Sequence, residues 1–321
     1  FQGVCSRNLY LRHFMRVHTN SNQLPVFRNA VVTIGTFDGV HTGHRQIINQ
    51  LKEEARAVDG ETVIITFHPH PRKIVSSKQI FILTTLPEKI ALLDKLGIDH
   101  LVVVPFDEHF ADQSAEAYVH DFLIEKFHPR VVIIGYDHRF GKGRQGDYHM
   151  MEEYAKKFGF ELREIPEHVL NNAAVSSTRT REALLGGNLA DANKYLGYAY
   201  FFEGIVTEGN KLGRTIGYPT ANIHINDNEK LVPANGVYAV LVTLVSTAEN
   251  FGGMMNIGVR PTLNGTKRTI EVNIFNFDRD IYGDTIKIFV EQYLRAEIKF
   301  SGLEALKEQL AKDKEAALAT L

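Results

Sequence analysis

The chain has 321 residues, of which 44% are hydrophobic, and this length and composition favour a globular protein of two domains. Its formal net charge of −2 gives no broad attraction to nucleic acid or to an anionic membrane. The single cysteine excludes an internal disulfide, and no apolar stretch approaches the ~20 residues of a membrane span. We therefore expect a cytoplasmic protein that requires no nucleic acid, membrane or obligatory protein partner.

The first 27 residues fit poorly with the sequence that follows. Phe1-Gln2-Gly3 looks like the end of a protease-site scar, and residues 9–17 are basic and partly apolar without a small-residue cleavage site. We expect residues 1–27 to be a non-catalytic extension, either a leader or the result of an upstream start.

From residue 30 to about residue 187, predicted strands alternate with predicted helices. The apolar runs 30–34, 62–67, 101–104 and 131–134 indicate buried strands. Helical patterns begin at Thr42 and near Pro87, and two more cover residues 115–127 and 148–158. This alternation is typical of a parallel sheet covered by helices on both faces. The loops that follow the strands then share one sheet edge, where such sheets bind ligands.

The most informative segment, residues 35–44, joins the first strand to the first helix. The helix beginning at Thr42 presents free N–H groups and the positive end of its dipole. His41 and His44 lie three apart, on one face of the first turn, and Gly43 between them lets a ligand approach the backbone. The pattern predicts an anion site, for which a nucleotide phosphate is the best candidate.

Three further segments are expected beside this corner. Residues 66–71 and 135–141 each follow a predicted strand, and residues 176–181 are predicted to start a helix, with hydroxyls as caps and arginines for phosphate. Placed donors of this kind suit adenylyl transfer, in which charge builds up on the α-phosphate and on the leaving pyrophosphate. A zinc site is the main alternative, with His41, His44, His68 and His70 as nitrogen ligands. No cysteine or carboxylate completes that set, so we favour phosphate.

After Tyr198 the pattern changes to successive strands, with no intervening helix before the end of the chain. The predicted strands cover residues 201–207, 236–243, 254–259, 269–277 and 285–293. They favour an antiparallel sheet or small barrel. A capping-box signature at residues 301–304 opens a final helix, with Leu303, Leu306 and Leu310 on one face. We place the two domains at residues 28–187 and 188–321.

The second domain carries its own chemistry-bearing residues. A loop with glycines and basic residues suits phosphates, although it lacks the ending of a P-loop. Its members are Gly209, Lys211, Gly213, Arg214 and Gly217. Thr220 and Asn222 are two apart on extended chain and offer hard oxygen ligands to Mg²⁺ from one face. Glu271 is predicted to share a strand face with Asn273.

Taken in order, these motifs resemble the bacterial bifunctional riboflavin kinase/FMN adenylyltransferases, also called FAD synthetases. The resemblance runs from about Ala30 to about Asp313. Its specificity lies in the ordered set of motifs at residues 35–44, 68–71, 135–141, 176–181, 213–222, 236–238, 256–262, 280–283 and 299–300, together with the strand that carries Glu271. It implies a Rossmann-like nucleotidyltransferase domain followed by an antiparallel kinase barrel with a C-terminal helix. It also implies phosphorylation of riboflavin by Mg-ATP to FMN, and then adenylylation of FMN by ATP to FAD and pyrophosphate.

The resemblance further implies roles for individual residues. His41 and His44 would act on the phosphates of ATP, and Glu271 would accept the proton of the ribityl 5′-hydroxyl. Nucleotide or phosphate contacts would come from Gly35, Phe37, Asp38, Gly43, Asp137, Ser177, Thr178 and Arg181, and in the kinase from Gly209, Lys211, Gly213, Arg214 and Gly217. Flavin contacts would come from His70, Arg139, Phe140 and Tyr218, and Mg²⁺ ligands from Thr220 and Asn222. His68 and His138 depart from the family pattern, where an acidic residue and a phenylalanine are common.

Two other functions fit parts of the sequence. The first domain alone suits an adenylyltransferase for another phosphorylated acceptor, but that interpretation leaves residues 219–222 and Glu271 unexplained. A non-enzymatic flavin-binding or sensor protein would need neither His44 nor Glu271.

Overall fold

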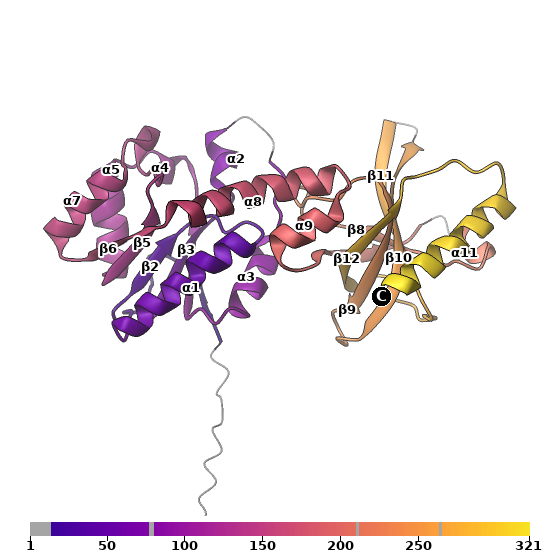
Figure 1. The fold of residues 1–321 in the computed structure, drawn as a ribbon, viewed down its shortest axis with the longest axis horizontal. Coiled ribbons are helices and arrows are strands. Elements are labelled where there is room, and N and C mark those ends of the chain that lie inside the picture. Colours follow the sequence, from indigo (N-terminus) through magenta and orange to yellow (C-terminus); the bar gives the residue numbers. More distant parts are fainter. Residues whose placement is uncertain (1–13, 77–79, 210–211, 263–264) are drawn as a thin grey trace, which may run out of the picture. The chain divides into compact units, whose positions relative to one another are not determined.

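The computed structural model describes residues 14–76, 80–209, 212–262 and 265–321 (Figure 1). By its internal contacts the chain divides into two units, each described by itself below. Unit 1 takes its residues from the ranges 1–37, 44–79 and 89–171, and unit 2 from 38–43, 80–88 and 172–321. Short segments from the first half of the sequence therefore belong to the unit that holds the second half.

Unit 1 is built on a six-stranded parallel sheet with the order β1-β4-β3-β2-β5-β6. The strands are β1 (Arg16–His18), β2 (Val31–Ile34), β3 (Thr62–His68), β4 (His100–Pro105), β5 (Val131–Gly135) and β6 (Glu161–Ile165). Successive residues of the central strands, such as Val31 and Val32, are completely buried, so both sheet faces are covered. The predicted parallel α/β domain is confirmed.

The helices predicted from Thr42, near Pro87 and at 148–158 are confirmed, as α1 (Thr42–Ala57), α3 (Leu86–Asp94) and α7 (Tyr148–Phe158). Two short helices, α2 (Pro71–Val75) and α4 (Glu108–Ala111), were not predicted. The predicted helix at 115–127 is helical throughout, as α5 (Ala115–Ala117), the π-helix η1 (Tyr118–Ile124) and α6 (Glu125–Phe127). A single-turn 3₁₀ helix, η2, covers Lys142–Arg144. One sheet face packs against η1, α6 and α7 through a buried cluster that includes Tyr118, Phe122 and Met151.

In unit 1, the two edge strands were not predicted from the sequence. The edge strand β6 alternates partly buried and exposed side chains and carries three charged residues, so it lacks the apolar run of a central strand. The other edge strand, β1, has only three residues and pairs in parallel with β4. Met15 and Phe27 are buried in unit 1, so part of the expected extension belongs to the sheet. Residues 1–13 lie outside the described residues.

Unit 2 contains a closed barrel with the strand order β10-β11-β8-β7-β12-β9. Its strands are β7 (Tyr200–Thr207), β8 (Ala221–His224), β9 (Gly236–Leu244), β10 (Asn250–Thr262), β11 (Gly265–Ile274) and β12 (Thr285–Arg295). Alternate residues such as Phe202, Val240 and Ile288 fill its interior. The ends of α8 (Glu167–Leu185) and α9 (Leu189–Leu196) pack on the same core through Leu184 and Leu196. The predicted antiparallel barrel is confirmed.

Two local predictions for the second half are wrong. A single-turn helix, α10 (Leu212–Thr215), interrupts the run of strands between β7 and β8. The last helix, α11 (Leu303–Thr320), begins after Gly302 without a side-chain cap, so residues 301–304 form no capping box. Leu303 is 54% exposed, whereas Asp313 and Ala317 are buried. The reason is tertiary, because Arg295 of β12 binds the Asp313 carboxylate with two hydrogen bonds and turns that helix face inward.

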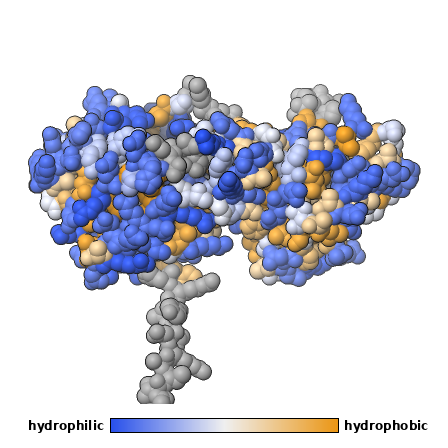
Figure 2. All heavy atoms as spheres, viewed as in Figure 1, coloured by the Kyte–Doolittle hydropathy of each residue, from blue (hydrophilic) through white to orange (hydrophobic). Residues whose placement is uncertain are grey.

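Hydrophilic residues cover most of the face drawn in Figure 2. Of the helices in the described part of the chain, none combines the length and the apolar character needed to cross a membrane.

Candidate functional site

The corner after β2 is a turn with unusual backbone conformations. Phe37, Gly39 and Val40 have φ angles of 47°, 82° and 38°, in the left-handed region that only glycine adopts readily. A Cβ at Gly39 would lie 2.8 Å from a Leu83 methyl carbon, so this position requires glycine for space as well. Tertiary contacts therefore hold this turn in place.

In unit 1, Phe37 supports His44. The two rings lie 5.0 Å apart, and Phe37 is only 2% exposed. Lys89 donates a hydrogen bond of 2.7 Å from Nζ to the Thr36 carbonyl, and this bond fixes the peptide group between Thr36 and Phe37. A Cβ at Gly35 would come within 3.0 Å of the Phe37 ring. Phe37 and Gly35 thus shape the corner by packing, and His44 lies partly exposed in the first turn of α1.

In unit 2, Asp38 is the centre of a buried hydrogen-bond network. Its carboxylate accepts hydrogen bonds from the Leu83 and Thr84 N–H groups at 2.9 and 3.0 Å. Arg181 donates to the same carboxylate at 2.6 Å. The Asp38 side chain is 3% exposed, so these donors compensate the desolvation of its charge.

His41 is fully buried, and its Nε2 lies 2.7 Å from the Ser177 hydroxyl oxygen. Burial lowers the pKa of His41 to about 4; the nearby Asp38 charge opposes this shift and Arg181 adds to it. The imidazole is therefore neutral at pH 7. A neutral imidazole carries one N–H donor and no positive charge.

The residues 176–181 lie inside α8, which begins at Glu167, so the predicted helix start is wrong. The Ser177 hydroxyl forms a hydrogen bond with His41 and does not cap the helix. Arg181 donates one hydrogen bond to the Asp38 carboxylate and a second, from Nε, to the Phe81 carbonyl at 2.9 Å. Thr178 is exposed. Hydroxyl residues fit a helix interior here because Ser177 has a tertiary partner.

The residues predicted to bind ligand in the loops after β3 and β5 have different environments. His70 caps α2, since its Nδ1 accepts a hydrogen bond from the Arg72 N–H at 3.2 Å. Phe140 is 4% exposed and stacks on Tyr118 at 5.0 Å, within the core of unit 1. Asp137 is exposed. The loop therefore presents Asp137 to solvent and buries Phe140.

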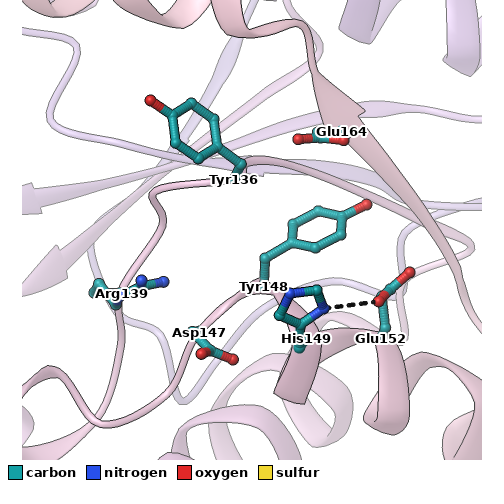
Figure 3. Close-up of a pocket in the computed structure, with 7 residues that line it drawn as sticks. All are labelled: Tyr136, Arg139, Asp147, Tyr148, His149, Glu152 and Glu164. Atoms are coloured by element: carbon teal, nitrogen blue, oxygen red, sulfur yellow. Dashed lines mark hydrogen bonds and ion pairs between the residues drawn. The ribbon is translucent and has the colours of Figure 1, made fainter.

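A cavity of about 440 Å³ lies beside the loop after β5 in unit 1 (Figure 3). It is lined by Tyr136, Arg139, Asp147, Tyr148, His149, Glu152 and Glu164. Arg139 faces residues at the start of α7. There, the Nδ1 of His149 lies 3.4 Å from a carboxylate oxygen of Glu152. Of the residues predicted to contact flavin, Arg139 alone lines this cavity.

In the barrel, the structure brings Asn222 and Glu271 together. They are directly opposite residues on the antiparallel strands β8 and β11. A Cβ at Gly209 would lie 2.0 Å from the Asn222 amide nitrogen, so the glycine lets the loop after β7 approach this pair closely. Glu271 and Asn273 line one cavity, which confirms that they share a strand face.

Two cavities of unit 2 meet at Thr220. The larger, of about 400 Å³, is also lined by Arg214, Arg279 and Tyr282. The smaller, of about 250 Å³, is lined by Gly213, Tyr218, Thr220, Asn256, Glu271, Asn273 and Arg295, among others. Of the predicted kinase residues, Gly213, Arg214, Tyr218, Thr220 and Glu271 line these two cavities, whereas Gly209, Gly217 and Asn222 do not. Gly217, with a φ of 83°, lies in the turn after α10, and Lys211 lies outside the described residues.

Several residues that line the smaller cavity were missed from the sequence. Arg295 and Asp313 belong to no recognisable motif, and they meet only because α11 packs against β12. Asn256 lies in a stretch that contributes to the resemblance, but its spacing alone signals no ligand. Only the folded barrel identifies these residues as a cavity wall.

The histidine, cysteine and carboxylate side chains of the described residues form no group of three or more that could hold a metal ion. The four histidines considered as zinc ligands are not brought together in such a group.

Comparison with known proteins gives matches along nearly the whole chain. The family model of FAD synthetase matches residues 24–179, and that of riboflavin kinase matches residues 196–321. A bifunctional riboflavin kinase/FMN adenylyltransferase of Haemophilus influenzae is 38% identical over 301 residues, which are 94% of this chain and 96% of the relative. A protein of the same name from Listeria monocytogenes is 39% identical, with 89% and 91% covered.

One solved structure is also similar over nearly its full length. It is a crystal structure from Streptococcus pneumoniae that carries the name macrolide-efflux protein. It superposes with a TM-score of 0.83 at 29% identity, and the alignment covers 95% of this chain and 98% of that one.

Proposed function

Because the chain belongs to the family of bifunctional riboflavin kinase/FMN adenylyltransferases, we propose that it phosphorylates riboflavin with ATP and then adenylylates the resulting FMN. We assign the adenylyl transfer to residues 28–187 and the kinase reaction to residues 188–321. We assign residues 1–27, which include the edge strand β1, a non-catalytic role. The products are FMN and ADP in the first reaction, and FAD and pyrophosphate in the second. We place the enzyme in the cytoplasm.

The kinase proposal rests on the two cavities that share Thr220. ATP occupies the larger cavity, where Arg214 and Arg279 supply positive charge for its phosphates. Riboflavin occupies the smaller one, with Tyr218 against the flavin and the ribityl chain directed at Glu271. Glu271 accepts the proton of the terminal ribityl hydroxyl while the hydroxyl oxygen attacks the γ-phosphorus of ATP. The bond between the γ-phosphorus and the oxygen that bridges it to the β-phosphate breaks, and ADP leaves.

The donor set at this point fits Mg²⁺. Thr220 and Asn222 offer a hydroxyl and an amide oxygen, and Glu271 opposite Asn222 adds local negative charge. Hard oxygen donors of this kind, completed by phosphate oxygens of the nucleotide, are what Mg²⁺ prefers. The ion, when bound, neutralises charge that develops on the transferred phosphoryl group. Thr220 and Asn222 would hold it, while Gly209 and Gly213 let the backbone come close to the nucleotide.

For adenylyl transfer, a phosphate oxygen of FMN attacks the α-phosphorus of ATP, and pyrophosphate leaves with the electrons of the broken P–O bond. His41 and His44, at the N-terminus of α1, donate hydrogen bonds to ATP phosphates. Ser177 and Arg181 position this corner through His41 and Asp38. Thr178, Asp137 and Gly43 remain assigned to the nucleotide, and His70, Arg139 and Phe140 to the flavin, on the family resemblance.

The observation that carries the proposal is the pairing of Glu271 with Asn222 beside Thr220, in a chain that also holds the His41–His44 corner. The test is chromatography of the products formed from riboflavin and Mg-ATP. We expect FMN first and FAD later. Recovery of unchanged riboflavin at saturating ATP would contradict the kinase assignment, and FMN that is never converted would contradict the adenylyltransferase assignment.

A further inference from the structure

Residues 81–84, here called the strap, connect two distant parts of the sequence within unit 2. The Ile82 N–H donates to the Glu229 carbonyl at 2.8 Å, and the Leu231 N–H donates to the Ile82 carbonyl at 2.9 Å. These bonds make a short parallel bridge between Ile82 and Lys230. The strap is therefore held to the segment that precedes β9.

Lys230 strengthens this attachment through its side chain. Its Nζ donates to the Leu83 carbonyl and to the Glu88 carboxylate, both at 2.6 Å. The same ammonium lies 4.7 Å from the centre of the Tyr200 ring. The side chains of Lys230 and Glu88 are 0% and 2% exposed. Breaking such a buried pair leaves the remaining charge without compensation, so the attachment is sensitive to either residue.

On its other side, the strap holds the anion-binding corner. Leu83 and Thr84 donate their N–H groups to the Asp38 carboxylate, and the Gly39 N–H donates to the Thr84 hydroxyl at 3.0 Å. Asp38 and Gly39 lie three and two residues before His41, in the turn where Phe37, Gly39 and Val40 have positive φ angles. A shift of the strap would therefore shift the backbone that presents His41.

We propose that Lys230, which lies in the part of the chain matched by the riboflavin kinase model, is a positioning residue for adenylyl transfer at the corner 38–41. This inference rests on the proposed function. Lys230 acts through the strap: it fixes Leu83 and Glu88, and the strap fixes Asp38. Since a misplacement of about 1 Å can cost roughly 10²-fold in rate, this indirect contact is sufficient to affect the reaction.

The test compares both reactions in the full-length Lys230→Met variant. We expect kcat for FMN adenylylation to fall at least tenfold, with KM for FMN and the rate of riboflavin phosphorylation within twofold of the unmodified chain. Lys287→Met is the matched control. Lys287 also contacts a carboxylate, Glu203 at 3.2 Å, and lies over the Phe201 ring at 4.0 Å. In Lys287→Met, the rates of FMN adenylylation and of riboflavin phosphorylation should both stay within twofold of those of the unmodified chain.

A second variant separates positioning from folding. Lys230→Met/Glu88→Gln removes both charges, so it should melt at a higher temperature than Lys230→Met alone. Its adenylylation should remain lowered, because the bond to the Leu83 carbonyl is still missing. Full recovery of adenylylation in the double variant would overturn the inference, and so would an equal loss of both reactions in each variant.

The outcomes also distinguish this inference from the function on which it rests. If the unmodified chain makes no FAD from FMN, the proposed function fails and the inference fails with it. If FAD formation survives Lys230→Met unchanged, only the inference fails.

Discussion

Glu271 lies directly across from Asn222 on the neighbouring antiparallel strand, and Glu271 lines the smaller of the two cavities that share Thr220. Two residues separated by 49 positions in sequence (271 − 222) thus become neighbours through strand register alone. That register places a carboxylate beside the expected Mg²⁺ ligand, where a base for the ribityl hydroxyl is needed.

The first prediction concerns this carboxylate. Glu271→Gln keeps the shape of the side chain but removes the proton acceptor, so riboflavin phosphorylation should fall by roughly 10²–10⁴. The conversion of supplied FMN to FAD should continue at the unmodified rate. Rates of FMN and FAD formation, measured separately, check this. A variant that phosphorylates riboflavin normally would remove Glu271 from the mechanism.

The second prediction concerns the corner before α1. His44→Ala removes one donor to the ATP phosphates, which should lower FMN adenylylation by roughly 10²–10³. Riboflavin phosphorylation should be unchanged, because the two cavities of the barrel lack this residue. The measurement is the same pair of assays. Equal losses in both reactions would argue against separate sites.

A third prediction concerns the helix–barrel ion pair of unit 2. Asp313→Ala leaves Arg295, whose side chain is 20% exposed, without its bidentate partner, and this should cost about 3 kcal/mol of unfolding free energy. Denaturant unfolding measures the loss. The control is Glu249→Ala, which removes a pair with Arg279 whose side chains are 45% and 47% exposed. Solvent screens that exposed pair, so its removal should change the unfolding free energy much less than Asp313→Ala does. Similar losses in both variants would contradict the stabilising role of the buried pair.

The fourth prediction concerns His138, whose buried Nε2 has no hydrogen-bond partner within the described residues. The centre of its ring lies 6.5 Å from the centre of the Tyr118 ring and 5.8 Å from that of the Phe140 ring. His138→Phe therefore replaces a buried polar nitrogen with an apolar carbon in this aromatic cluster. We expect the variant to be more stable by about 1–3 kcal/mol at pH 7.5.

The same variant should also change the pH dependence of stability. Burial, reinforced by the charges of Arg144 and Arg139, lowers the pKa of His138 to about 4. The unfolded chain takes up the proton near pH 6.5, whereas the folded chain resists until about pH 4, so His138 costs stability as the pH falls through this window. The gain from His138→Phe should therefore be larger at pH 5 than at pH 7.5. A constant or smaller gain in thermal unfolding at pH 5 would contradict this assignment.

Periodicity was sufficient for most elements but failed where tertiary contacts decided. The strands around Val31 and Ile64 are apolar on both sides and could be recognised directly. The edge strands β1 and β6 could not, because one is very short and the other is charged. The residues 176–181 looked like a helix start because hydroxyl residues often cap helices, yet Ser177 bonds to His41 from within α8.

By itself, the sequence determined the two fold classes, the strand-to-helix corner with its paired histidines, and the family, because these follow from local patterns and short motifs. The tertiary structure alone decided that Glu271 faces Asn222, that His41 is buried and neutral, and that Arg295 meets Asp313. It also placed Lys230 against the strap that holds Asp38. These relationships depend on strand register, burial and packing between distant segments, and no local pattern of residue types encodes them.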